Sequence, residues 1–210
     1  MTCCSDLYHT KFDSAQAAAD LSDYLQSGVK RNSRPLLRLI QDLNLQGGHV
    51  LDIGSGVGTI TFELLKRGAG SASLVDISSA YLDAFRQEAN RRQLDHISTH
   101  AGDCVELKSQ LKNAELVVMD KVICCYPDWK PLIQTVSGLS TRWIAFSLPR
   151  DEWWVKTGEW LDTKWRQLRG DHFPTYIHPI GEIEYLLATL GFQNREMNKW
   201  REWEYHLYQK

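Results

Sequence analysis

Five short apolar segments, separated by stretches with helical periodicity, constrain the fold of this chain more than any other feature. Apolar runs of four to eight residues that alternate with amphipathic segments are typical of strands connected by helices. Strands joined in this way run parallel, and a parallel sheet needs helices on both of its faces. We therefore expect an α/β protein with a doubly wound sheet. The expected strands are residues 49–53, 71–76, 97–100, 115–119 and 142–147.

The segments around these strands complete the expected fold. Helical spacing, capping residues and terminal glycines predict helices at 13–26, 33–45, 60–68, 79–93, 130–139 and 178–190. The last two segments, 192–200 and 201–210, alternate like an antiparallel hairpin. The sequence thus predicts a mostly parallel seven-stranded sheet with a C-terminal antiparallel hairpin. With 210 residues, the chain is long enough for one well-filled core and short for two, so we expect a single domain over 1–210.

Two parts of the chain lie outside the alternating pattern. Residues 1–45 precede the first strand, and we expect them to form a helical lid over the strand ends. Residues 150–177 carry four tryptophans and fit neither strand nor linker, so we expect an inserted helical cover over the substrate. The alternative is that the rings, Trp153, Trp154, Trp160 and Trp165, only pack the insertion against the sheet.

Charge and composition limit the partners that the chain can have. The 24 basic and 26 acidic residues give a net charge of −2, which offers no strong field for a nucleic-acid backbone. No run of 18 apolar residues predicts a membrane span, and the early acids do not fit a secretory signal. The five cysteines are odd in number and lack CxxC spacing. We therefore expect reduced thiols, no metal site and a cytoplasmic location.

A glycine-rich segment follows the first expected strand directly. Alternating glycines let the backbone turn tightly and let a ligand approach where a Cβ atom would clash. The helix that follows directs its free amides at that ligand. A dinucleotide fingerprint would carry glycine or alanine where this chain has Thr59. An acid before the loop suits a cationic amine and would oppose a pyrophosphate. The predicted contacts are Asp52, Gly54, Ser55, Gly56 and Gly58.

Three further acids follow the next three strands. The carboxyl ends of parallel strands meet at one edge, so we expect Asp76, Asp103 and Asp120 to line the crevice where such sheets bind ligands. Asp76 is placed to accept hydrogen bonds from two ribose hydroxyls, and Asp103 from the exocyclic amine of adenine. Each acid alone could be a helix cap or a turn residue. The ordered set beside the glycine loop favours a ligand site.

These motifs resemble those of the class I S-adenosylmethionine-dependent methyltransferases. LDIGSGVG (51–58) is similar to their glycine loop, LVDIS (74–78) to the segment with the ribose-binding acid, and AGDC (101–104) to the adenine-binding segment. The resemblance covers residues 33–148 and implies a Rossmann-like methyltransferase fold with S-adenosyl-L-methionine as cofactor. It implies that the loop holds the methionine part of the cofactor. The other implied cofactor residues are Asp76, Ile77, Ser78, Gly102, Asp103, Cys104, Asp120 and Lys121, the last two near the sulfonium.

A closer resemblance follows the fourth strand. DKVICCYPD (120–128), SLPR (147–150) and YIH (176–178) are similar to the magnesium-protoporphyrin IX O-methyltransferase-like branch, which methylates a carboxyl on a large flat ring. That branch usually carries His-Tyr-Pro where this chain has Cys125-Tyr126-Pro127, which favours a simpler ring over a porphyrin. The resemblance implies O-methylation of a small, planar, largely apolar acceptor.

Three residues near the expected pocket are candidates for catalysis. His178, Asp128 and Tyr126 are candidates for a general base, and His172 is a weaker one. Tyr126 could also orient the acceptor. Arg150 could pair with a substrate carboxylate, or only with Asp151 or Glu152. A carboxylate acceptor needs no base, whereas a hydroxyl acceptor does. The predicted catalytic residues are His178, Tyr126 and Arg150.

Two other functions remain open at this stage. Enzymes that methylate nucleic-acid amines tend to carry Asn or Asp-Pro-Pro-Tyr after the fourth strand, where this chain has Asp120-Lys121-Val122-Ile123. A regulatory protein could also bind the cofactor without methylating anything. The sequence does not fix the oligomeric state or the methylated atom. We therefore expect a small-molecule acceptor and no nucleic acid, and an acceptor screen would separate these functions.

Overall fold

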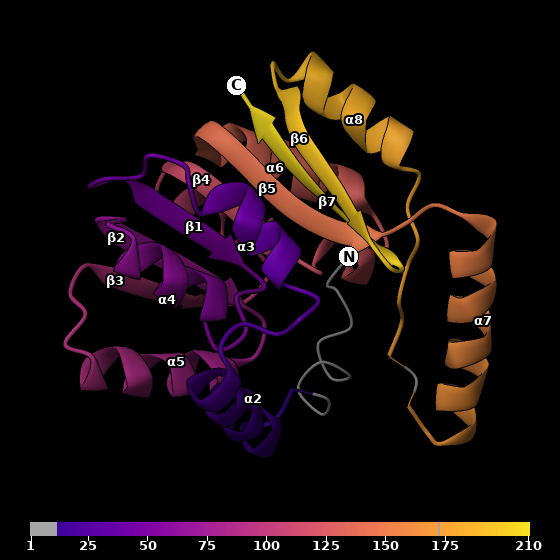
Figure 1. Ribbon diagram of the computed structural model, residues 1–210, viewed down its shortest axis with the longest axis horizontal. Coiled ribbons are helices and arrows are strands. Elements are labelled where there is room, and N and C mark those ends of the chain that lie inside the picture. Colours follow the sequence, from indigo (N-terminus) through magenta and orange to yellow (C-terminus); the bar gives the residue numbers. More distant parts are fainter. Residues whose placement is uncertain (1–11, 172) are drawn as a thin grey trace.

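The computed structural model describes residues 12–171 and 173–210, and its centre is one twisted seven-stranded sheet (Figure 1). The strand order is β3-β2-β1-β4-β5-β7-β6, in which β1 to β5 run parallel and β7 pairs antiparallel with both β5 and β6. The predicted fold class is confirmed. The strands are His49–Ile53 (β1), Ser71–Asp76 (β2), Ile97–Ala101 (β3), Ala114–Asp120 (β4), Ser140–Pro149 (β5), Gln193–Trp200 (β6) and Trp203–Gln209 (β7).

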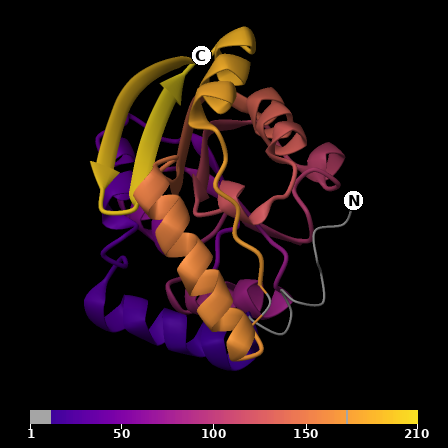
Figure 2. The ribbon, with the colours of Figure 1, turned by 90° about the vertical axis from the view of Figure 1, so that its right-hand side faces the viewer.

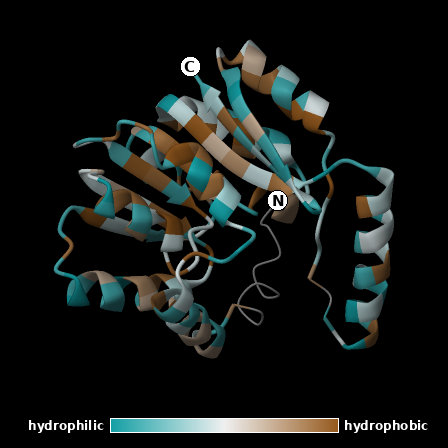
Figure 3. Cartoon of the chain, viewed as in Figure 1, coloured by the Kyte–Doolittle hydropathy of each residue, from teal (hydrophilic) through white to brown (hydrophobic). Residues whose placement is uncertain are grey.

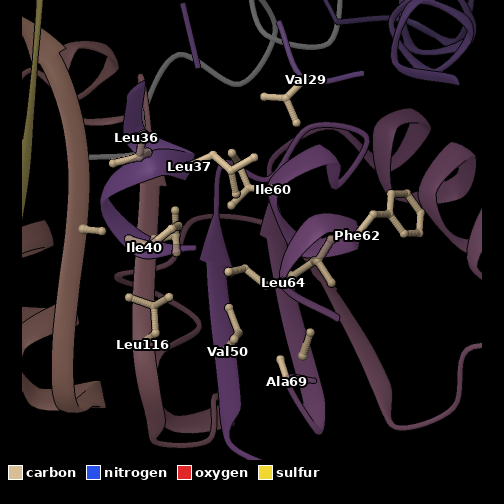
Figure 4. Packing of buried hydrophobic residues seen from close by; sticks show 14 of the residues in the cluster. Val29, Leu36, Leu37, Ile40, Val50, Ile60, Phe62, Leu64, Ala69 and Leu116 are labelled. Carbon is tan, nitrogen blue, oxygen red and sulfur yellow. The ribbon is translucent and has the colours of Figure 1, made fainter. Parts of the chain in front are cut away.

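Helices cover both faces of this sheet, and alternate residues of the central strands bury against them. Leu116 and Val118 of β4 pack with α3, α4 and α5, whereas Val117 and Met119 pack with α6 and α8. All four strand residues are fully buried. Apolar residues gather on the strands in Figure 3. Figure 4 shows residues of the core on the face covered by α3, α4 and α5. The helices are Arg34–Ile40 (α3), Thr59–Lys66 (α4), Ser79–Arg91 (α5), Trp129–Leu139 (α6) and Ile180–Thr189 (α8).

The helix expected at 33–45 is shorter in the structure and ends at Ile40. The Asn44 side chain accepts a hydrogen bond from the Gln46 amide at 3.4 Å, a local bond that competes with helix formation. Gln46 then forms an isolated antiparallel bridge with Ala69, which leads the chain into β1. The turn that leads into β1 therefore begins before the apolar periodicity of this segment ends.

The N-terminal helix Ser14–Ser27 (α2) lies against α5 at the carboxyl ends of the strands (Figure 1). Asp13 caps it by accepting from the Gln16 amide at 2.8 Å. Tyr24 is buried and stacks on Phe62 with the ring centroids 5.7 Å apart. Residues 1–11 of the expected lid, which include Cys3 and Cys4, lie outside the described residues, as does His172.

The insertion after β5 consists of one long helix, Trp153–Leu168 (α7), and an extended return segment that leads to α8. In Figures 1 and 2, α7 runs along the outside of the molecule rather than across the sheet. In the described part of the chain, no helix is both long and apolar enough to cross a bilayer.

Candidate active site

A cavity of about 300 Å³ opens at the carboxyl ends of β1, β2 and β4. This size lies at the small end of the range for small-molecule sites. The glycine loop, the acids that follow the strands and the N-terminal segments line it. The predicted cofactor residues in its lining are Asp52, Gly54, Ser55, Gly56, Asp76, Ile77, Gly102, Asp103, Cys104, Asp120 and Lys121.

The glycine loop takes a left-handed backbone at three positions, with φ +60° at Gly54, +55° at Gly56 and +72° at Gly58. A Cβ atom on Gly54 would lie 2.5 Å from Val122 Cγ2. On Gly58 it would lie 2.3 Å from Phe85 Cδ2, in the core and away from the cavity. On Gly56 it would make only an ordinary contact, 3.5 Å from Tyr81 Cδ1. Gly58 therefore differs from its predicted role, because it lets α4 pack against α5 and does not contact the cavity.

Asp76 connects the loop to the second strand. Its two carboxylate oxygens accept from the Gly56 amide at 2.8 Å and from the Ser78 amide at 2.9 Å. Burial raises the pKa of Asp76, and the backbone hydrogen bonds oppose that rise. Each oxygen keeps a further lone pair for a ligand hydroxyl. Ser78 does not line the cavity, because its hydroxyl caps α5 and donates to the Phe12 carbonyl at 2.6 Å.

Asp52 is buried beneath the loop and accepts from the Thr61 hydroxyl at 2.7 Å. Burial raises its pKa to about 7, and the nearby carboxylates of Asp120 and Asp76 add to the rise. A cationic ligand in the cavity would relieve this repulsion and lower the pKa again. The electrostatics of this end of the cavity therefore favour a ligand that carries positive charge.

Asp103 and Tyr126 meet across the cavity. The Tyr126 hydroxyl donates to Asp103 Oδ1 at 3.0 Å, and the Val105 amide donates to the same oxygen at 2.7 Å. The pair lies beside Cys104, whose pKa is raised to about 12 by burial and by the Asp103 carboxylate. Cys104 is therefore a neutral thiol that packs in the wall rather than a nucleophile.

Asp120 lies at the centre of a polar cluster that sequence reasoning did not foresee. Its carboxylate accepts from the Ser33 hydroxyl at 2.5 Å and from the Ser147 hydroxyl at 2.6 Å. Lys121 has a left-handed backbone, with φ +62°, and its Nζ donates to Ser33 Oγ at 2.8 Å and to Asn32 Oδ1 at 3.1 Å. The segment before α3 is thereby held against the end of β4.

A second N-terminal contact lies on the other side of the cavity. Asp20 of α2 accepts from the Tyr81 hydroxyl at 2.8 Å and from Lys30 Nζ at 2.8 Å. Burial opposes ionisation of Asp20, but these hydrogen bonds outweigh it and lower its pKa. Phe12, Tyr24 and Gly28 also line the cavity. No spacing rule links residues 12–33 to the strand ends, so the sequence predicted a lid but none of its contacts.

The structure does not bring His178 and Arg150 into the cavity lining. His178 is buried, and its Nε2 donates to the Tyr126 carbonyl at 2.9 Å, which joins the segment after α7 to the loop after β4. Burial lowers its pKa. Arg150 pairs with Glu152 and donates to the Arg201 carbonyl at 3.0 Å. The expected base and anion clamp thus have local partners, whereas Tyr126 lines the cavity.

The tryptophans of α7 also differ from expectation, because no α7 residue lines the cavity within the described ranges. Trp153 is 79% exposed, Trp160 60% and Trp165 56%. Part of the insertion, Trp153–Leu168, is helical, but these rings do not line the cavity.

Comparisons with known proteins agree with this architecture. Residues 50–140 match the family model described as a methyltransferase domain. A stretch of 99 residues is 28% identical to ubiquinone biosynthesis O-methyltransferase from Coxiella burnetii and covers 47% of this chain. The match spans 42% of that protein, so this chain covers less than half the length of the curated relatives it matches.

Two solved structures share the fold along nearly the whole chain. Magnesium protoporphyrin IX methyltransferase from Synechocystis PCC 6803 with bound SAH has a TM-score of 0.72 at 17% identity, covering 98% of this chain and 99% of that one. An O-methyltransferase family protein from Burkholderia thailandensis has a TM-score of 0.73 at 14% identity, covering 97% and 62%. The resemblance to S-adenosylmethionine-dependent methyltransferases is confirmed, in sequence over the central part and in fold over the whole sheet.

Proposed function

We propose that this protein binds S-adenosylmethionine and transfers its methyl group to an oxygen of a small, planar, largely apolar acceptor. The observation that carries the proposal is one cavity that joins the glycine loop to the acids at the ends of β2, β3 and β4. In this proposal Asp76 holds the ribose and Asp103 the adenine, and the charges of Asp52 and Asp120 support a cationic ligand.

The residues present fit this cofactor. Ser55 Oγ is buried and has no hydrogen-bond partner among the described residues, so it can serve a bound ligand. Gly56 leaves the space that a Cβ would fill. The buried Asp52 carboxylate is near its titration point and gains from a positive charge nearby. Donors, space and charge therefore all suit a ligand with an amino group and a sulfonium.

Bound there, S-adenosylmethionine would supply an electrophilic methyl group. The protein must hold the acceptor in line with that group and exclude water. We assign acceptor orientation to the Tyr126 hydroxyl, which Asp103 fixes, and to Lys121, which the Ser33–Asp120 cluster fixes. The acceptor oxygen forms the new bond to carbon while the carbon–sulfur bond breaks towards sulfur.

The acceptor oxygen in this proposal is already anionic, either a carboxylate or an acidic phenol. His178 does not line the cavity, so it offers no base to a neutral alcohol bound there. The Lys121 ammonium, whose contact to Asp120 Oδ2 is long at 3.4 Å, can exchange it for an anionic acceptor oxygen. His178→Ala should then weaken folding, because the Tyr126 carbonyl loses its partner, and change turnover less than the 10²–10⁴-fold typical of a general base.

Calorimetry with S-adenosylhomocysteine tests the cofactor site. Asp76→Ala should weaken binding by about 100-fold, because two charged hydrogen bonds are lost. Asp76→Asn keeps one oxygen acceptor and should weaken it less. Asp42→Ala, an exposed acid before β1, is the matched control and should leave affinity unchanged. Unchanged affinity in Asp76→Ala would overturn the assignment of the site.

A methyl-transfer screen with product mass analysis tests the reaction. The panel contains aromatic acids, phenols, quinolines, metalloporphyrins and RNA. We expect O-methylation of a planar acid or phenol. A product methylated on nitrogen, carbon or sulfur, or activity on RNA alone, would contradict the proposed acceptor, and tight cofactor binding without any product would favour a regulatory protein.

A further inference from the structure

Helix α7 exposes an unusual set of large apolar side chains. Leu168 is 82% exposed, Trp153 79%, Trp160 60%, and both Trp165 and Leu161 56%. Successive residues of an α-helix are rotated by about 100°, so these five side chains fall on one face of α7. A contiguous apolar patch of this kind on a protein surface marks a contact site.

The opposite face of α7 is the polar one, and it faces the protein. Val155 is buried there, and Arg166 has several polar partners. The Arg166 guanidinium pairs with Glu159 at 3.0 Å and with Asp162 at 2.7 Å, and it donates to the Phe173 carbonyl at 2.9 Å. The helix therefore turns Val155, Glu159 and Arg166 towards the protein, leaves Asp162 exposed at the edge of that face, and carries its rings outside.

The basic and acidic residues of α7 also lie on different faces of the helix. Lys164 projects from the middle of the tryptophan face, and no ion pair is recorded for it within the described part of the chain. Lys156 and Arg169 border this face. Lys156 is paired with Asp151 at 2.5 Å, whereas the Arg169 guanidinium lies 4.6 Å from the centroid of the Trp165 ring. The acids of α7, Glu159 and Asp162, lie on the face that carries Arg166. The outward face is thus aromatic and cationic.

We infer that α7 docks this protein on the surface of an anionic lipid bilayer. Tryptophan suits the boundary between headgroups and acyl chains, because its ring is apolar and its N–H is polar. Lysine and arginine at the centre and border of such a face reach anionic headgroups while their stems lie along apolar surface. The helix lies along the outside of the molecule in Figures 1 and 2, where a flat surface can reach it. This inference does not depend on the proposed methyl transfer.

Co-sedimentation of the full chain with lipid vesicles tests the inference. The chain should bind vesicles that contain phosphatidylglycerol, bind pure phosphatidylcholine more weakly and dissociate as salt rises. The triple variant Trp153→Ala, Trp160→Ala, Trp165→Ala should reduce binding at least about tenfold. Lys164→Gln and Arg169→Gln should each reduce it about fivefold on anionic vesicles alone. Tyr185→Ala removes an equally exposed ring from α8 and should change nothing.

A second measurement separates docking from unfolding and from self-association. Tryptophan emission of the wild type should shift to the blue on anionic vesicles, and calorimetry should find S-adenosylhomocysteine affinity unaltered in the triple variant. Equal binding by the triple variant and the wild type would overturn the inference. A blue shift that depends on protein concentration without lipid, with a dimer in analytical ultracentrifugation, would also overturn it, because a second copy would then cover the face.

Discussion

Similar residues are buried at the glycine-loop end of the molecule and exposed on the α7 insertion. Around the loop, rings such as Phe62 and Phe85 are fully buried and acids such as Asp52 lie in the protein interior. On α7, rings such as Trp153 and Trp160 face solvent. The difference teaches that aromatic content alone does not locate a pocket. The sequence concentrated tryptophans in the C-terminal half, yet the cavity lies against the N-terminal half.

The largest expected difference between the two regions is in the stability lost when a glycine is substituted, and it is expected at Gly58. A Cβ atom there meets Phe85 at 2.3 Å and the backbone has φ +72°, so Gly58→Ala should lower the free energy of unfolding by about 3–4 kcal/mol. Gly170 also has a left-handed backbone, with φ +82°, but nothing lies within 4 Å of its Cβ position. Gly170→Ala should therefore cost only about 1 kcal/mol. Urea unfolding measures both, and equal losses would show that overlap with Phe85 contributes nothing.

The pH dependence of stability is the next largest expected effect. Burial raises the pKa of Asp52 from 3.8 to about 7, so the folded protein binds this proton more tightly than the unfolded chain. The protonated Asp52 side chain makes its full contribution to the free energy of unfolding below pH 4. This contribution is lost as the pH rises to about 7. Asp52→Asn should remove this loss, on the order of 2–3 kcal/mol between pH 4 and 7. Asp162→Asn on α7 removes an exposed ion pair and should change stability by less than about 1 kcal/mol.

If the free energy of unfolding changed with pH equally in Asp52→Asn and in the wild type, the result would contradict the buried state of Asp52. Urea unfolding of the ligand-free protein at several pH values between 4 and 7 measures the slope. Ligand must be absent, because a bound cation would lower the pKa of Asp52 and hide the effect.

Removing the hydroxyl of Tyr126 should have a smaller effect. The hydroxyl donates to Asp103 in a partly buried position, so Tyr126→Phe should cost about 1 kcal/mol of unfolding free energy. It should also lower turnover more than it lowers S-adenosylhomocysteine affinity, because we assign this hydroxyl to the acceptor. Tyr185→Phe, on an exposed ring, should change neither quantity. A larger loss of cofactor affinity than of turnover would assign Tyr126 to cofactor binding instead of acceptor orientation.

The smallest expected effect lies on α7. Trp160→Ala removes a ring that is 60% exposed, so it should alter the free energy of unfolding in water by no more than about 0.5 kcal/mol. Phe62→Ala, at the fully buried ring beside the loop, should cost about 3–5 kcal/mol. Thermal or urea unfolding of both variants checks the contrast. A large loss in Trp160→Ala would show that this face is covered in solution.

Much of the fold follows from local pattern. The strand bounds at 49–53 and 71–76 were predicted to the residue, because each is an apolar run between a helix stop and a turn. The loop and its acids were predicted as one group, since parallel strands bring their carboxyl ends together. The end of α3 was not, because the chain leaves the helix at Ile40 on its way to the bridge between Gln46 and Ala69, a long-range contact that periodicity does not register.

The sequence alone determined the α/β sheet, the glycine loop at the end of β1 and the acids that line the cavity, because periodicity and strand direction act along the chain. Only the tertiary structure decided which side chains face that cavity. His178 donates to a backbone carbonyl, and Arg150 pairs with Glu152 and donates to another carbonyl. Ser33 bonds to Asp120, and Asn32 to Lys121, although about 90 residues of chain separate the members of each pair. Such contacts depend on where distant segments pack, and no local spacing encodes them. The same packing turned the polar face of α7 inward and left its tryptophans outside.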